Sequence, residues 1–170
     1  MSRDELRVEP GPITVVQLKD VLRSKITTQV EHAGFVLQLS CSEAAAVRTL
    51  TVDDDAFVQI MINLVDNAIK FSARAEKRLI AIDFSLADDG RVEIAVRDHG
   101  PGIPRDQLKK ICHLFYRSEN ERTRETVGTG IGLALVHRLT TAMGGEVDVI
   151  NRDPGAEFRL RFPSDRSGDF

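Results

Sequence analysis

The sequence lacks several features that would place it in particular classes of protein. It has no tryptophan and one tyrosine, and its two cysteines, Cys41 and Cys112, match no metal-binding spacing. The net charge is −3, without the basic excess that nucleic acids attract. No apolar run approaches the ~20 residues of a membrane-spanning helix, and no signal-peptide pattern opens the chain. These absences favour a cytoplasmic domain with reduced cysteines and no nucleic-acid partner.

The chain does have enough length and apolar content for one hydrophobic core. Its 170 residues are 42% hydrophobic and 29% charged, as in ordinary globular domains. Residues 1–12 end in Pro10-Gly11-Pro12, a combination that we expect to resist any regular element. We therefore interpret this segment as a tail or linker.

Hydrophobic periodicity predicts three long helices, at residues 14–34, 53–71 and 131–143, and a short helix near 105–112. Strands at 35–40 and 46–52 are expected to form a hairpin, as are those flanking residues 88–90 and 154–155. Because helices separate strand pairs, we predict an α+β fold. It would be a two-layer sandwich with a mixed, mostly antiparallel sheet and three main helices on one face.

The helix predicted at 53–71 has an unusual polar face. Asn63, Asn67 and Lys70 lie opposite its apolar residues, with Gln59 and Asp66 beside them. Such a face is usually a solvated surface, although surface helices seldom favour asparagine. An amide oxygen can also complete a magnesium shell, and a lysine can contact phosphate. The residues alone leave both interpretations open.

Two glycine-rich segments suggest close approach of the backbone to a ligand. Asp98 precedes Gly100 and Gly102 at a strand end, where a carboxylate can accept a hydrogen bond from an exocyclic amine, although a simple turn is the alternative. The segment 128–132, Gly-Thr-Gly-Ile-Gly, leads into the third long helix, so its N–H groups can face an anion. Its spacing fits neither the dinucleotide fingerprint nor the P-loop. A glycine turn that caps a core helix is the alternative here.

Four segments in order carry a family resemblance: Asn63-x3-Asn67-x2-Lys70, Asp98-x-Gly100-x-Gly102, Leu-Phe-Tyr-Arg at 114–117, and Gly128-x-Gly130-x-Gly132-Leu133. Together they resemble the N box, first glycine box, F box and second glycine box of the catalytic ATP-binding domain of sensor histidine kinases. This GHKL superfamily includes type II topoisomerase and mismatch-repair ATPases. The resemblance extends from about Pro12 to Pro163 and implies the Bergerat ATP-binding fold.

The resemblance implies a role for each matching residue. Asn67 matches the Mg²⁺ ligand, and Asn63 matches a catalytic residue that helps to hold phosphate and metal. Asp98 matches the acid that binds the adenine amino group, with Ile103 packed on the base. The other residues implied to bind ATP are Lys70, Phe71, Gly100, Gly102, Tyr116, Arg117, Gly128, Thr129, Gly130, Gly132 and Leu133. Residues 104–127 would form a mobile lid over the nucleotide.

The function implied by the resemblance is transfer of the ATP γ-phosphate to a histidine on a separate dimerisation domain. Relatives that hydrolyse ATP carry glutamate at the position of Asn63, and asparagine cannot act as a general base for water. None of the four histidines here has the acceptor context His-Glu-aliphatic-Arg/Lys-x-Pro. We therefore expect a monomeric catalytic fragment whose partners are the dimerisation domain and a response regulator receiver domain. The resemblance leaves open an inner-membrane anchor on the parent protein.

The expected organisation is a linker at 1–12 after a missing acceptor domain, the catalytic domain at 13–163 and a C-terminal tail at 164–170. One departure from the family is Gly155-Ala156-Glu157-Phe158, which lacks the threonine of the usual Gly-Thr-x-Phe. Two alternatives share the fold. An anti-sigma-factor-type serine kinase is disfavoured by the connector-like N-terminus and the long lid. A non-catalytic nucleotide-binding module is disfavoured because every nucleotide-contact position is intact.

Overall fold

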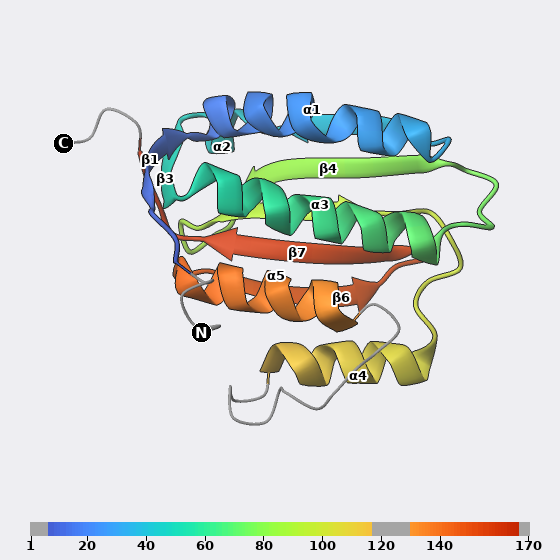
Figure 1. Ribbon diagram of the computed structural model, residues 1–170. Coiled ribbons are helices and arrows are strands. Elements are labelled where there is room, and N and C mark those ends of the chain that lie inside the picture. The colour runs from blue at the N-terminus through green and yellow to red at the C-terminus, as the bar shows by residue number, and fades with distance from the viewer. Residues whose placement is uncertain (1–6, 117–129, 167–170) are drawn as a thin grey trace.

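The computed structural model describes residues 7–116 and 130–166 (Figure 1). The elements in chain order are β1 (Gly11–Thr14), α1 (Val15–His32), β2 (Val36–Cys41), α2 (Glu43–Ala46), β3 (Arg48–Val52), α3 (Asp54–Phe71), β4 (Leu79–Leu86), β5 (Val92–Arg97), α4 (Arg105–Tyr116), α5 (Gly130–Ala142), β6 (Glu146–Asn151), β7 (Ala156–Phe162) and β8 (Ser164–Arg166). The three long helices α1, α3 and α5 therefore lie close to their predicted positions.

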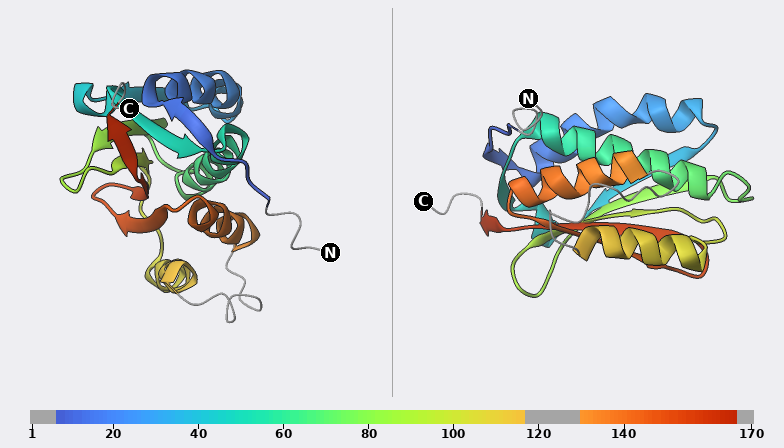
Figure 2. Two further views of the ribbon diagram at one scale, coloured as in Figure 1. Left: turned by 90° about the vertical axis from the view of Figure 1, so that its left-hand side faces the viewer. Right: turned by 60° about the horizontal axis from the view of Figure 1, so that its bottom comes forward.

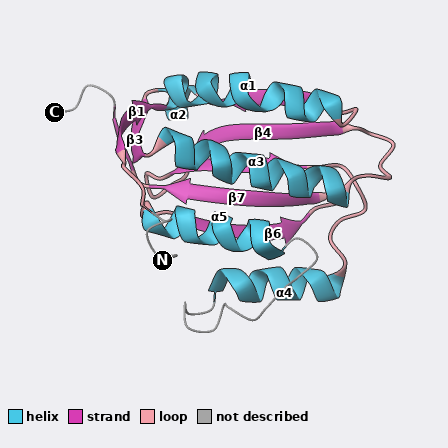
Figure 3. Ribbon diagram, in the orientation of Figure 1, coloured by secondary structure: helices cyan, strands magenta, loops and turns pink. Residues whose placement is uncertain are grey.

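The main sheet has the strand order β2-β4-β5-β7-β6. Only the β2–β4 pair within it is parallel, and the other three pairs are antiparallel. Helices α1, α3 and α5 lie side by side on one face of this sheet (Figures 2 and 3). The α+β two-layer fold, with a mixed and mostly antiparallel sheet, is confirmed, and so are the β4–β5 and β6–β7 hairpins.

The predicted hairpin of residues 35–40 and 46–52 is wrong. Between the two strands lies the short helix α2, whose first turn is capped by Ser42 through a hydrogen bond from the Ala45 N–H. Strand β2 pairs in parallel with β4, while β3 joins β1 and β8 in a separate antiparallel sheet. A hairpin loop would have placed β3 beside β2. The capped helical turn α2 instead carries the chain from the main sheet to the small sheet.

The expectation that residues 10–12 form no regular element is also wrong, because β1 begins at Gly11. Proline is tolerated there since β1 is an edge strand of the small sheet β1-β3-β8, where its missing N–H costs little. Strand β8 completes that sheet from the C-terminal side. The division into 1–12, 13–163 and 164–170 remains a prediction.

Helix α3 packs between α1 and α5 and supplies much of the core between helices and sheet. Its apolar face is fully buried, as predicted, and consists of Phe57, Ile60, Met61, Leu64, Val65 and Ala68. The Phe57 ring lies 6.4 Å from the ring of Phe84 in β4 and 6.3 Å from that of Phe162 in β7. Burial of a large apolar side chain such as Phe57 contributes about 1.5–3 kcal/mol to the stability of the fold. This packing fixes the opposite, polar face of α3 toward α5.

Both cysteines are free thiols, each partly buried, and burial raises the pKa of Cys41 and of Cys112. In the described parts of the chain, no helix combines the length and hydrophobicity that crossing a membrane requires.

Candidate functional site

The polar face of α3 meets the first turn of α5. The Nδ2 atom of Asn63 donates a hydrogen bond to the Gly132 carbonyl oxygen at 3.0 Å, and its Oδ1 accepts one from Gln59 at 2.9 Å. One turn later, Asn67 Nδ2 donates to the Asn63 carbonyl oxygen at 2.8 Å, and the side chain is only 2% exposed. A solvated surface therefore does not explain the two asparagines, which line the junction between two helices.

Lys70 extends from the same face beyond the asparagines. Its Nζ lies 3.0 Å from Asp66 Oδ2, and both side chains are more than half exposed. A surface pair of this kind contributes little to stability, so the ammonium remains available to a stronger anion. Phe71, the last residue of α3, packs partly buried against the core. Contact of either residue with a nucleotide stays a prediction.

Helix α5 begins at Gly130 and runs for 13 residues. The first N–H groups of a helix have no acceptor within the helix, and together with the helix dipole they favour an anion. Gly132 belongs to this turn, and a Cβ added to it would lie 3.7 Å from Asn63 Nδ2. The Leu133 side chain is fully buried in the core, which leaves its backbone as the part able to face a ligand.

Asp98 follows β5 and is fully buried. Its Oδ1 accepts a hydrogen bond from the Gly100 N–H at 2.9 Å, and its own N–H donates to the Ala156 carbonyl oxygen at 3.1 Å. Its Oδ2 is buried without a hydrogen-bond partner among the described residues. Burial raises the pKa of the Asp98 carboxyl, although N–H groups of Gly100 and Ala156 oppose that shift. The site thus contains a buried acceptor with unused capacity.

The glycines after Asp98 allow close packing of the loop against other parts of the protein. A Cβ at Gly100 would lie 2.7 Å from the Cα of Ser72 and 2.8 Å from the Phe71 carbonyl oxygen. Gly100 is therefore needed for contact with the end of α3, which the sequence did not indicate. Gly102 has a φ of +90°, a backbone conformation that residues other than glycine rarely adopt.

Two residues of the β6–β7 hairpin hold this loop through contacts that the sequence did not indicate. The Asn151 side chain accepts a hydrogen bond from the Ile103 N–H at 2.9 Å and donates one to the Ile103 carbonyl oxygen at 3.0 Å. A Cβ added to Gly155 would overlap the Asp98 carbonyl oxygen. The local sequence around Asn151 indicates only a turn, and the likeness of the segment from Gly155 to the family's Gly-Thr-x-Phe does not reveal the contact with Asp98.

Part of the expected lid is the helix α4, which is longer than the predicted 105–112. Its residues Ile111, Leu114 and Phe115 are buried and belong to the hydrophobic core. The predicted ATP-binding residues Arg117, Gly128 and Thr129 and the remainder of the lid lie outside the described residues, as does the side chain of Tyr116.

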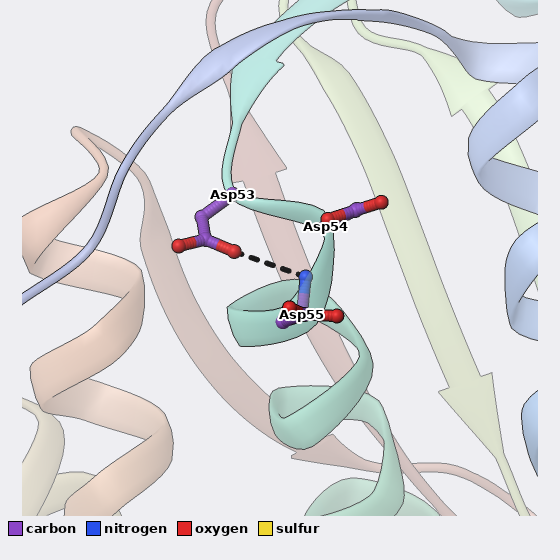
Figure 4. A group of neighbouring side chains, drawn as sticks. All are labelled: Asp53, Asp54 and Asp55. Carbon is purple, nitrogen blue, oxygen red and sulfur yellow. Dashed lines mark hydrogen bonds between the residues drawn. The ribbon is translucent and has the colours of Figure 1, made fainter.

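An acidic group at the start of α3 consists of Asp53, Asp54 and Asp55, whose ligand atoms lie within 4.8 Å of one another (Figure 4). Asp53 is the N-cap of α3: its carboxylate accepts hydrogen bonds from the N–H groups of Asp55 and Ala56. It also accepts one from Glu9 N–H at 2.9 Å. Acidic side chains stabilise the positive end of a helix. Helix capping therefore explains this group.

The family described as histidine kinase-, DNA gyrase B- and HSP90-like ATPases matches residues 52–166 of the chain, a span that includes α3, Asp98, the start of α5 and the β6–β7 hairpin. The chain belongs to this family. A sensor-like histidine kinase of Rhizobium meliloti is 33% identical over 168 residues, which cover 98% of this chain and 31% of that protein. The sensor histidine kinase WalK of Bacillus subtilis is 31% identical over 120 residues, covering 71% of this chain and 19% of WalK. The chain thus spans less than a third of these relatives.

Solved structures of histidine kinases have the same fold. Full-length ShkA in complex with AMPPNP superposes with a TM-score of 0.69 at 27% identity, covering 96% of this chain and 33% of ShkA. The nucleotide-free catalytic domain of ThkA gives a TM-score of 0.70 at 22% identity, covering 91% of this chain and 95% of that domain. The resemblance to sensor histidine kinase catalytic domains is confirmed.

Proposed function

We propose that this histidine-kinase-like domain binds Mg-ATP between α3, the loop 98–103 and the start of α5, and transfers the γ-phosphate to a histidine. The observation that carries the proposal is Asp98 Oδ2, a buried carboxylate oxygen without a hydrogen-bond partner among the described residues. Buried polar atoms nearly always have a hydrogen-bond partner, because an unpaired one has an unfavourable desolvation free energy. A ligand that donates a hydrogen bond to Asp98 Oδ2 offsets that unfavourable free energy. The exocyclic amine of adenine is such a donor. The AMPPNP bound to ShkA, an ATP analogue, supports this choice.

The residues of α3 fit the metal that would accompany ATP. Mg²⁺ prefers hard oxygen ligands, and the amide of Asn67 offers one beside the first turn of α5. Asn63 hydrogen-bonds to that turn, so it joins the proposed metal side to the proposed phosphate side of the site. When bound, the metal would neutralise charge on the phosphates. Lys70 and the N–H groups of α5 would add positive potential from the protein.

Asn63 determines the type of reaction in this proposal. A side-chain amide has no basic group at neutral pH, so it cannot remove a proton from water. Phosphoryl transfer would then depend on positioning and electrostatic stabilisation, with the γ-phosphate retained for a protein acceptor. We place that acceptor histidine on a separate dimerisation domain of a longer kinase, with the catalytic domain in the cytoplasm. A response regulator receiver domain would be the next partner.

Calorimetric titration with ATP, with and without Mg²⁺, tests the binding site. We expect Asn67→Ala to lose Mg-dependent affinity for ATP, because the metal ligand is gone. Gln38→Ala, an exposed amide on β2, serves as a control and should bind like the wild type. Unchanged Mg-dependent affinity in Asn67→Ala would contradict the metal assignment.

The acceptor is tested by incubating the chain with labelled ATP and the dimerisation domain of its parent kinase. We expect a phosphoryl product that is labile in acid and stable in base, as phosphohistidine is. An acid-stable product would instead indicate a serine kinase. ATP binding without any transfer would indicate a non-catalytic module.

A further inference from the structure

We infer that Asn151 is a positioning residue for base recognition, one that determines how well the site distinguishes adenine from other bases. The inference rests on the proposed ATP site. Asn151 is the last residue of β6 and contacts Ile103 at the end of the loop 98–103. Under the proposal, Asp98 binds the adenine amine and Ile103 packs on the ring. Asn151 itself would touch neither the base nor the phosphates.

The contact between Asn151 and Ile103 fixes both position and orientation. The amide of Asn151 makes two hydrogen bonds, at 2.9 and 3.0 Å, to the N–H and the carbonyl oxygen of the same residue. It therefore acts as a strand partner would, satisfying both backbone polar groups of one residue. Gly102 lies against it: a Cβ there would be 3.1 Å from Asn151 Oδ1. A single residue with one donor and one acceptor thus sets the path of the chain into α4.

The same hairpin holds the beginning of the loop. The Asp98 N–H donates to the Ala156 carbonyl oxygen, and the Arg97 guanidinium donates to the Pro154 carbonyl oxygen at 2.9 Å. Gly155 packs directly against the Asp98 backbone. The β6–β7 hairpin therefore contacts both ends of the loop, and it sets the separation between the Asp98 carboxylate and the Ile103 side chain.

Removal of the Asn151 amide should loosen one end of the loop without opening the core. Asn151 is exposed, whereas Ile103 is held in the core with a side chain only 3% exposed. The proposed phosphate and metal groups lie on α3 and α5, and within the part of the chain that the structure describes the Asn151 side chain hydrogen-bonds to Ile103 and not to these helices. Asn151→Ala should therefore weaken the contacts with the base and leave the contacts with the phosphates unchanged. This predicts an effect on KM for ATP and on base selectivity, with kcat little changed.

The test compares ATP with purine riboside triphosphate, which lacks the 6-amino group. For Asn151→Ala we expect about a tenfold loss of ATP affinity by calorimetry, the size expected for one or two neutral hydrogen bonds. The analogue should lose less, so the ratio of the two affinities narrows. Asn151→Asp keeps the acceptor for the Ile103 N–H but turns a carboxylate oxygen toward the Ile103 carbonyl oxygen in place of the donor, so it should weaken ATP binding at least as much as Asn151→Ala. In the full-length parent kinase, KM for ATP should rise while kcat stays within twofold.

Glu146→Ala is the matched control, because it alters the other end of β6 by removing the ion pair with Arg91. It should bind both nucleotides like the wild type, and thermal unfolding of all variants shows whether they fold. Equal losses for ATP and the analogue in Asn151→Ala, or wild-type affinity for both, would overturn the inference while leaving the ATP site intact. Failure of the wild type to bind ATP would overturn the proposed function itself, and the inference with it.

Discussion

Replacing Asp98 with asparagine should make the protein bind ATP more weakly while its folded state becomes no less stable. The substitution keeps the size and shape of the side chain. It also keeps an oxygen that can accept the Gly100 N–H at the position of Oδ1. What changes is the second atom: the unpartnered Oδ2 acceptor becomes an NH2 donor. An adenine amine would then face another donor.

The expected magnitudes follow from that single atom. A hydrogen bond to a charged group contributes about 1.5–3 kcal/mol, which corresponds to roughly a 10- to 150-fold loss of ATP affinity. A buried unsatisfied neutral group costs about 1–3 kcal/mol, whereas an uncompensated buried charge costs more. The carboxylate with its unpartnered oxygen is thus at least as costly to the free protein as the amide. The free energy of unfolding of Asp98→Asn should equal or exceed that of the wild type.

Titration calorimetry with ATP and with purine riboside triphosphate, together with urea unfolding of the free proteins, measures both quantities. The affinity for the analogue should change far less than that for ATP, because the analogue has no amine to donate. If Asp98→Asn bound ATP with wild-type affinity, the carboxylate would not be the base-recognition group. If Asp98→Asn lost affinity for both nucleotides and also had a lower free energy of unfolding, Asp98 would be a structural residue.

Three further predictions concern stability, chemistry and pH. Gly155→Ala should lower the free energy of unfolding by more than about 2 kcal/mol in urea titrations, because its Cβ overlaps the Asp98 carbonyl at a φ of +92°. Gly144→Ala has φ +82° but nothing within 4 Å of the added Cβ, so it should lose only about 1 kcal/mol, and equal losses would refute the overlap. Asn63→Glu or Asn63→Asp should alter nucleotide turnover, measured as phosphate release from Mg-ATP, because a carboxylate can act as a base for water; rates identical to the wild type would count against that role. The raised pKa of Asp98 means that the folded state holds its proton more tightly than the unfolded state, so ionisation lowers stability as pH rises through the folded pKa. The stability of Asp98→Asn relative to the wild type should therefore grow from acid to neutral pH in paired unfolding curves, and a constant difference would contradict this.

Local sequence patterns predicted the elements whose determinants are local. The apolar spacing of α3 follows from one helix packing on one core, and the β4–β5 and β6–β7 hairpins follow from turn residues between their strands. The pairing of β2 with β4 and of β3 with β8 could not be predicted in this way. Arg48 on β3 hydrogen-bonds to Ser164, 116 positions later, and no local pattern encodes that separation.

The same distinction applies to the candidate site. Asn63 and Asn67 stand one turn apart on a helix whose opposite face is apolar, so their shared face was visible in the sequence. Asn151 was not visible, because its partner Ile103 is 48 positions away and an asparagine at a strand end normally indicates a turn. Motifs therefore located the groups that we expect to contact the ligand. The groups that hold them in place required the structure.

The packing around Asp98 explains how a buried carboxylate oxygen can remain without a protein partner. A flexible loop would move until such an oxygen found a donor, because an unpaired acceptor is costly. Here Gly100 lies against the end of α3 and Gly155 lies against the Asp98 backbone, each at a distance that excludes even a Cβ. These two glycines thus pack against the loop from both sides and restrict the movement of its backbone. The rigidity that leaves the oxygen unpaired in the free protein also holds it in position for a ligand. Binding then requires little loss of conformational entropy from the loop.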